Sequence, residues 1–142
     1  MHLQSEIVVP QDIEQVNEFF YEPSSLAKWD RSVKEMIPTG NETNEPTFDT
    51  IAPSGMKMSY KVIELVYGKS CKIELLGSKM FKNAIWEFVF DAVEKGTRIT
   101  CHITYKLRPL YYFLAPVLYF TRGALLRDLK FLRDALDKNY SV

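Results

Sequence analysis

Alternation of apolar and polar residues dominates the middle of the chain and predicts strands. Between Val33 and Lys106, short alternating runs are separated by turn-forming residues such as Pro53-Ser54-Gly55. This spacing predicts about six strands, and the loops are too short for helical crossovers, so we expect an antiparallel meander. A β-rich segment from Leu3 to Val9 adds one strand before them.

The segment after the first strand has the period of an amphipathic helix. From Gln11 to Glu22, apolar side chains recur every three or four residues, and Pro23 stops the helix. A second short helical turn is expected from Ser24 to Trp29, because serine is a good N-cap residue. Trp29 is expected to anchor the next loop by burial.

The helical period returns after Pro109 and continues to the end of the chain. Because proline is poorly tolerated inside a helix, we expect the main helix from about Pro116 to Asn139, preceded by a short turn. At 1.5 Å per residue this helix is roughly 35 Å long, enough to cross a sheet. A sheet with one apolar face must cover that face, and this helix is the expected cover. Its apolar stripe contains Leu118, Leu125, Leu129, Leu132 and Leu136.

The predicted strands each place apolar side chains on one face, which we expect to line a pocket opposite the terminal helix. The alternative is that the same side chains fill a core without a cavity, which for any single residue is the more ordinary role. On the sheet the expected lining consists of Met58, Tyr60, Val62, Cys71, Ile73, Leu75, Trp86, Phe88, Phe90, Ile99, Cys101, Ile103 and Tyr105. On the helix it consists of Leu118, Arg122 and Leu125.

Composition and charge exclude several classes of function. The 142 residues suit a single domain, and no linker-like stretch divides them. Eighteen basic residues balance eighteen acidic residues, so no net field attracts nucleic acid, and no nucleic-acid partner is expected. No signal peptide is recognisable, and the most apolar run, Leu110 to Phe120, is shorter than the ~20 residues that span a bilayer. We expect a cytoplasmic monomer or weak homodimer without stable membrane insertion.

The two cysteines predict neither a metal site nor a disulfide. Cys71 and Cys101 form no CxxC motif and have no histidine nearby, and we expect no metal and no cofactor. In a meander they lie two strands apart, about 9–10 Å at the usual strand spacing. This separation exceeds the ~7 Å limit between Cα atoms for a disulfide.

Catalysis requires a titratable group that points inward, and few are available. His102 falls on the polar face of its strand, and His2 is expected at a frayed terminus. Asp128, within the apolar arc of the terminal helix, and Tyr105 are the two weak candidates for proton transfer. Because a buried carboxylate must be paired or neutralised, a structural role for Asp128 is favoured. We therefore expect binding more than catalysis.

An aromatic stretch precedes the terminal helix and has three interpretations. Tyr111, Tyr112, Phe113, Tyr119 and Phe120 could gate the pocket, touch a membrane during lipid exchange, or pack against the rim of the sheet. The stretch lacks the lysine-rich polar face of an interfacial helix. Packing against the rim is therefore the favoured interpretation.

The opening of the chain resembles that of START-like domains, in the polyketide cyclase/dehydrase branch of the SRPBCC superfamily. The similar segment is EIVVPQDIEQVNEFFYEPSSLAKWDRSV, in which a strand, a proline-marked turn, an amphipathic helix and Trp29 occur in order. An aromatic strand with Trp86 and Phe88 then leads to Lys95-Gly96-Thr97-Arg98, and LRDLKFLRDAL forms the last helix. The resemblance covers nearly the whole chain.

The resemblance implies an α+β helix-grip fold over residues 1–142, with ligand binding as its function. In this fold a seven-stranded curved antiparallel sheet surrounds a long C-terminal helix, and two short helices follow the first strand. Family members bind lipids, sterols, hormones or polyketides, and some catalyse cyclisation or dehydration. We expect a small hydrophobic molecule or lipid in a cavity between sheet and helix. Two alternatives stay open: a polyketide cyclase/dehydratase-like enzyme, and a chaperone-regulator-like module that uses the outer face of the sheet.

Overall fold

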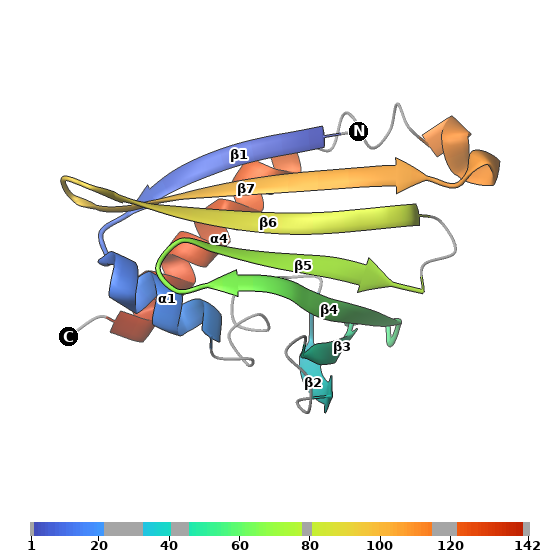
Figure 1. Ribbon diagram of the computed structural model, residues 1–142, viewed down its shortest axis with the longest axis horizontal. Helices are drawn as coiled ribbons and strands as arrows, with labels where there is room; N and C mark the ends of the chain where they lie inside the picture. The colour runs from blue at the N-terminus through green and yellow to red at the C-terminus, as the bar shows by residue number, and fades with distance from the viewer. Residues whose placement is uncertain (1, 22–32, 41–45, 78–80, 115–121, 141–142) are drawn as a thin grey trace.

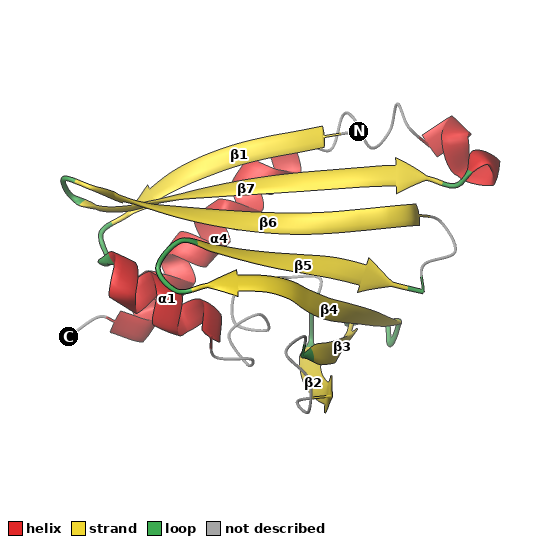
Figure 2. Cartoon of the chain, in the orientation of Figure 1, coloured by secondary structure: helices red, strands yellow, loops and turns green. Residues whose placement is uncertain are grey.

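One antiparallel sheet contains all of the described strands, with a long helix behind it (Figures 1 and 2). The computed structural model describes residues 2–21, 33–40, 46–77, 81–114 and 122–140, without the side chains of residues 21, 114 and 122–125. The strands are β1 (His2–Val9), β2 (Glu35–Gly40), β3 (Thr47–Ile51), β4 (Lys57–Val66), β5 (Ser70–Leu76), β6 (Phe81–Val93) and β7 (Gly96–Leu107). The helices are α1 (Ile13–Tyr21), the 3-10 helix η2 (Pro109–Leu114) and α4 (Arg122–Tyr140). Among the described helices, none is long and apolar enough to cross a membrane.

The strand order is β1-β7-β6-β5-β4-β3-β2. Strands β2 to β7 therefore form the expected meander, and β1 adds antiparallel beside β7, with His2 opposite Thr104 and Val9 opposite Thr97. The seven-stranded curved sheet and the terminal helix confirm the predicted helix-grip fold. Figure 1 shows α4 behind the sheet, α1 at one end of it and η2 at the other.

The register confirms which residues share the inner face. Phe88 pairs with Cys101, and Trp86 pairs with Ile103, so the apolar sets of β6 and β7 lie side by side. Cys71 pairs with Phe88 from the other side. The two cysteines are thus separated by a whole strand, and both are free thiols, as the sequence predicted.

Helix α1 begins with a capping box. The backbone N–H of Gln15 donates to Asp12 Oδ1 at 2.8 Å, and the N–H of Asp12 donates to Gln15 Oε1 at 3.1 Å. This reciprocal pair satisfies two of the N–H groups that a helix leaves unpaired at its start. The helix therefore begins two residues later than Gln11, the predicted start.

A close approach of the chain fixes β1 and β7 at the same end of the molecule. Gly96 has a positive φ of 146°, and a Cβ there would overlap the carbonyl of Val9. The hydroxyl of Thr97 donates to the carbonyl of Gln11 at 2.9 Å, which joins the start of β7 to the entry of α1. Only glycine fits this approach of two backbones.

Helix α4 covers one part of the inner face and creates the main core. We name this core the α4 cluster: Ile7, Val9, Val16, Phe19, Phe88, Phe90, Ile99, Cys101, Leu129, Leu132 and Leu136. Leu132 and Leu136 are fully buried, and Leu129 is nearly so. Burial of each such side chain contributes about 1.5–3 kcal/mol.

Several expectations need correction at the ends of elements. His2 belongs to β1, paired with Thr104, so the expected frayed terminus is wrong. Tyr111 packs against the cluster of Leu75, Ala84, Tyr105 and Leu107. Tyr112 and Phe113 are exposed, so the prediction that they pack against the rim of the sheet is wrong. The second helical turn with Trp29, the expected helix start at Pro116, and Tyr119 and Phe120 lie outside the described residues.

We expect Leu132→Ala to lower the free energy of unfolding by about 2–5 kcal/mol, because it leaves a cavity in a site that is 0% exposed. Denaturant unfolding followed by circular dichroism measures the change. Leu126→Ala, on the exposed side of the same helix, is the control and should change stability by less than about 0.5 kcal/mol. Equal losses for the two variants would contradict the placement of α4.

Candidate ligand-binding site

A row of five apolar side chains crosses the inner face and is only partly buried. We call it the middle row, and its members are Leu3, Val62, Ile73, Trp86 and Ile103. Each is the register partner of the next: Val62 with Ile73, Ile73 with Trp86, Trp86 with Ile103, and Ile103 with Leu3. The row is therefore apolar surface of the inner face that the described helices do not fully cover.

Buried residues flank the middle row on both sides. On one side Phe88 and Cys101 belong to the α4 cluster. On the other side lies a smaller core, the Tyr105 cluster, formed by Leu75, Ala84, Tyr105 and Leu107. Leu3, Trp86 and Ile103 pack against both cores, so the row is the seam between them.

Aromatic rings extend the apolar surface toward β3. Phe48 stacks on Tyr60 with ring centroids 5.3 Å apart, and Tyr60 meets the edge of Trp86 at 5.8 Å. The contact between Tyr60 and Trp86 spans β5, where Leu75 is opposite Tyr60 and Ile73 is opposite Trp86. These offset and edge contacts hold the rings in place. Phe48 is buried, whereas Tyr60 and Trp86 stay partly exposed.

Tyr105 is buried and stays neutral over the physiological range. It is 5% exposed, and its ring meets Phe81 edge-on at 5.6 Å. Burial raises the pKa of the Tyr105 hydroxyl above its ordinary value. A phenol in this state can donate a hydrogen bond but is a poor general base.

The two inner-face thiols are also held neutral. Burial raises the pKa of Cys71 to about 11 and that of Cys101 to about 12. The negative charge of Asp128 adds to the effect at Cys101, which places this carboxylate of α4 near β7. Neutral buried thiols are poor nucleophiles, so both cysteines act as small apolar residues.

The expected site residues divide into three groups in the structure. Phe88, Phe90 and Cys101 lie in the α4 cluster, where side chains of α1 and α4 pack against the sheet and bury them. Met58, Tyr60, Ile73, Trp86 and Ile103 are partly exposed, whereas Cys71 and Tyr105 beside them are buried. Leu118 lies outside the described residues, as do the side chains of Arg122 and Leu125.

The prediction missed Leu3 and Phe48. Leu3 alternates with Ser5, Ile7 and Val9, and this pattern could have placed it on the inner face. Phe48 lies beside Asp49, and the face of that short strand could not be read from its sequence.

The structure pairs Asp49 with Ser59 of the neighbouring strand. The Ser59 hydroxyl donates to Asp49 Oδ1 at 2.7 Å, and Lys57 Nζ lies 3.2 Å from Asp49 Oδ2. The hydrogen bond from Ser59 and the charge of Lys57 lower the pKa of Asp49.

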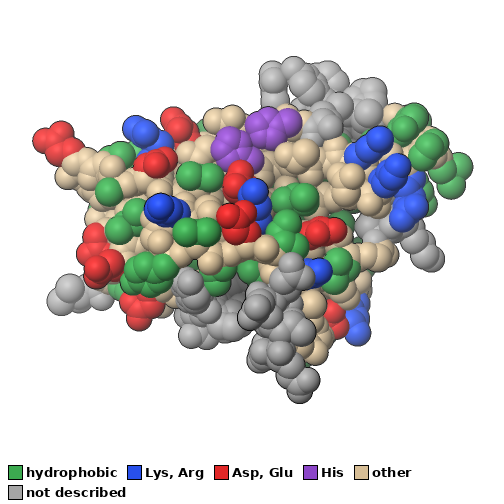
Figure 3. Space-filling view, in the orientation of Figure 1, with side chains coloured by type: hydrophobic (Ala, Val, Ile, Leu, Met, Phe, Trp, Pro, Cys, Tyr) green, Lys and Arg blue, Asp and Glu red, His purple; other side chains and the backbone are tan. Residues whose placement is uncertain are grey.

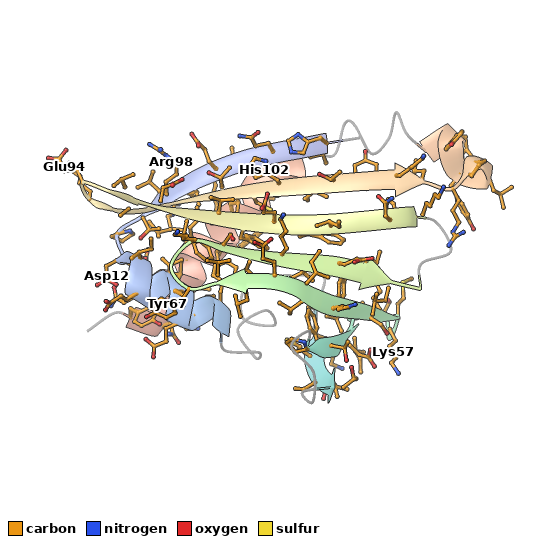
Figure 4. The ribbon with its side chains drawn as sticks, in the orientation of Figure 1. Asp12, Lys57, Tyr67, Glu94, Arg98 and His102 are labelled. Atoms are coloured by element: carbon orange, nitrogen blue, oxygen red, sulfur yellow. The ribbon has the colours of Figure 1, made fainter. Side chains whose placement is uncertain are left out.

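The opposite, outer face of the sheet carries charged side chains interspersed with hydrophobic ones (Figure 3). Lys72 lies 3.3 Å from Glu64 and 3.5 Å from Glu87. His2 and His102 stack with ring centroids 5.2 Å apart, and His2 Nε2 lies 3.1 Å from His102 Nδ1. Figure 4 shows His102 on this face, away from α4. Within the described ranges, no group of three or more His, Cys, Asp or Glu side chains could hold a metal ion.

We expect both thiols to resist modification in the folded protein. At about pH 8, pKa values of about 11 and about 12 leave about one thiolate in a thousand or fewer. Labelling with Ellman's reagent should be slow in buffer, and both thiols should react at once in guanidinium chloride. Rapid labelling of one thiol in the native protein would contradict the burial of that cysteine.

Comparison with solved structures identifies the same fold in other proteins. TTHA0849 from Thermus thermophilus matches with a TM-score of 0.80 and 18% identity, over 99% of this chain and 100% of that chain. A START superfamily protein from Mycobacterium smegmatis matches with a TM-score of 0.74 and 12% identity, over 96% of this chain and 97% of that chain. At such identities the likeness establishes the fold alone.

A third solved structure is a larger protein. The di-domain ARO/CYC StfQ from the steffimycin biosynthetic pathway matches with a TM-score of 0.74 and 14% identity. The match covers 99% of this chain and 52% of that one, so this chain spans about half the length of StfQ.

Comparison with curated proteins found no match. The family model described as polyketide cyclase / dehydrase and lipid transport matches residues 1–139, and the chain belongs to that family, with the START-like fold.

Proposed function

We propose that residues 1–142 form one domain that binds a small hydrophobic molecule or lipid between the inner face of the sheet and α4. The observation that carries this proposal is the middle row, in which five apolar side chains from five strands stay partly exposed on the inner face. A ligand that covered the row would remove apolar surface from water, which is favourable by roughly 25 cal/mol per Å².

The side chains around the row indicate the chemistry of the ligand. The row itself contains only apolar residues, and the hydroxyl-bearing side chains of Tyr60 and Tyr105 lie beside it. A charged ligand would lose its hydration there without gaining an opposite charge from the row. The site therefore suits a largely apolar, uncharged molecule with one or two hydroxyl or carbonyl groups.

The family and the structural neighbours agree with this proposal in general terms. The family description includes lipid transport, and one neighbour is named as a START superfamily protein. The free, buried cysteines fit the cytoplasmic location that the sequence predicts. That location and a monomeric or weakly dimeric state stay predictions.

We expect Ile73→Glu to weaken binding of the neutral fluorescent probe N-phenyl-1-naphthylamine by roughly tenfold or more. A carboxylate in the middle row must lose water when the probe covers it, and this desolvation opposes binding. Fluorescence titration measures the affinity, and native mass spectrometry of fresh protein looks for a co-purified ligand.

The control for this substitution is Val89→Glu, on the outer face of the neighbouring strand β6. It makes the same chemical change and should leave probe affinity within about twofold. Thermal unfolding of both variants checks that each is folded. Failure of the wild-type protein to bind the probe, or equal losses in both variants, would refute the proposed site.

A polyketide cyclase- or dehydratase-like enzyme is the second candidate, favoured by the carboxylate of Asp128 near Cys101 on the inner side. If this is the function, Asp128→Asn and Tyr105→Phe should abolish turnover of a poly-β-ketone substrate while probe affinity stays within about threefold. Product analysis by liquid chromatography and mass spectrometry measures turnover. Wild-type protein that binds such a compound without converting it would exclude this candidate for that substrate.

A further inference from the structure

The 3-10 helix η2 presents large apolar side chains to solvent at one end of the sheet. Leu110 is 78% exposed, Phe113 72% and Tyr112 55%. Between them Tyr111 turns inward and packs against the Tyr105 cluster, and its N–H donates to the carbonyl of Arg108 at 2.8 Å. One aromatic side chain thus anchors the helix, while three apolar side chains project from it.

Basic side chains lie at the same end of the sheet as this apolar tip. Lys106 and Arg108 lie at the end of β7, Lys82 lies at the start of β6, and all three are exposed. The two strand ends are neighbours, because Phe81 pairs with Leu107 and Asn83 pairs with Lys106. Figure 3 shows the blue Lys and Arg side chains beside the green side chains at this end of the molecule. We call these six residues the end patch: Leu110, Tyr112, Phe113, Lys82, Lys106 and Arg108.

We propose that the end patch docks reversibly onto the surface of an anionic phospholipid bilayer. Tyrosine and phenylalanine side chains are favoured at the depth of lipid headgroups, and lysine and arginine are attracted to anionic lipid. In the docked state η2 lies among the headgroups, with Leu110 and Phe113 directed toward the acyl chains. Lys82, Lys106 and Arg108 face lipid phosphates.

The charge of the end patch argues against a second copy of this chain as the occupant. A twofold dimer would place the same surface on both sides of the interface. The three basic side chains would then face three more, and like charges across an interface are repulsive. The occupant must instead carry negative charge.

The shape of the end patch argues for a membrane over an acidic protein. A six-residue helix supplies the whole apolar part of the patch. A stable protein interface needs roughly 800 Å² from each partner, with a packed centre. Three projecting side chains are too few for such a centre, but they suffice to enter a fluid headgroup layer. The overall net charge of zero does not oppose docking, since only local charges within about 8–10 Å of the surface are felt at physiological salt.

Vesicle sedimentation tests the proposal with the whole chain. We expect the wild-type protein to co-sediment with vesicles of phosphatidylcholine containing about 30% phosphatidylglycerol, and to bind pure phosphatidylcholine much more weakly. The double variant Leu110→Ser/Phe113→Ser should bind the anionic vesicles roughly tenfold or more less well. The double variant Lys82→Gln/Lys106→Gln should also bind the anionic vesicles roughly tenfold or more less well. Its binding should depend less on salt than that of the wild type when NaCl rises from about 0.1 M to about 0.5 M.

Matched controls lie at the opposite end of the sheet. Tyr67→Ser removes an aromatic side chain that is 66% exposed, and Lys95→Gln removes an exposed cation from the β6–β7 turn. Figure 4 places Tyr67 and Glu94, the neighbour of Lys95, at that end. Both variants should bind anionic vesicles like the wild type. All variants should retain the wild-type unfolding temperature, since every substituted side chain is exposed.

Three outcomes would overturn the proposal. The first is a wild-type protein that fails to sediment with anionic vesicles. The second is vesicle binding that the end-patch variants leave unchanged. The third is a wild-type dimer in sedimentation velocity that the Leu110→Ser/Phe113→Ser variant converts to a monomer, which would assign the patch to self-association. The affinity for N-phenyl-1-naphthylamine should be unchanged in the end-patch variants. Loss of the membrane-docking proposal can therefore be told apart from loss of the proposed ligand site.

Discussion

A single helix cannot cover the inner face of a sheet this large, and the rest of the structure follows from that mismatch. Seven strands at a spacing of ~4.8 Å give a sheet about 29 Å wide, and the 13 residues of β6 extend roughly 43 Å. The 19 residues of α4 form a rod roughly 28 Å long and ~10 Å across. Where α4 and α1 lie against the sheet, Leu132, Val16 and Ile99 are fully buried. Next to them, the described helices leave the five side chains of the middle row only partly buried.

The two faces of the sheet differ in charge as well as in cover. The outer face holds Lys72 between Glu64 and Glu87, where water screens each ion pair and its contribution to stability is small. On the inner face, burial keeps the thiols of Cys71 and Cys101 neutral. An apolar ligand that covers this face therefore does not have to remove water from a charged side chain of the sheet. Asp128 is the exception on the helix side, and it is the group with which chemistry in this site would begin.

Sequence alternation was sufficient to predict the faces of the long strands. Trp86, Phe88, Cys101 and Ile103 lie where the period of two placed them, because one buried face constrains every second residue. The pairing of β1 with β7 was not predicted, since strands about ninety residues apart share no local signal. The division of the inner face was not predictable either. Phe88 and Trp86 are equivalent in sequence pattern, and only the packing of α1 and α4 decides that the first is buried and the second is partly exposed.

Short segments were the hardest to predict, for a physical reason. In η2, the aromatic residues share the composition of a core segment, so burial was the natural expectation. The 3-10 geometry separates neighbouring side chains by about 120°, which lets Tyr111 turn inward while Tyr112 and Phe113 turn outward. Composition alone cannot distinguish these directions.

The anchoring of Tyr111 also connects the two proposed surfaces. Tyr111 packs against the Tyr105 cluster, and the same cluster contacts Trp86 and Ile103 of the middle row. At the opposite end of the sheet, α1 and the α4 cluster fill the inner face, with Phe20 packed between Phe88 and Phe90 at centroid distances of 4.9 and 5.0 Å. At the η2 end the buried Tyr105 cluster lies between the 3-10 helix and the middle row. Docking of η2 on a bilayer would therefore bring that end of the site next to the headgroup layer, so that an apolar ligand need not cross water.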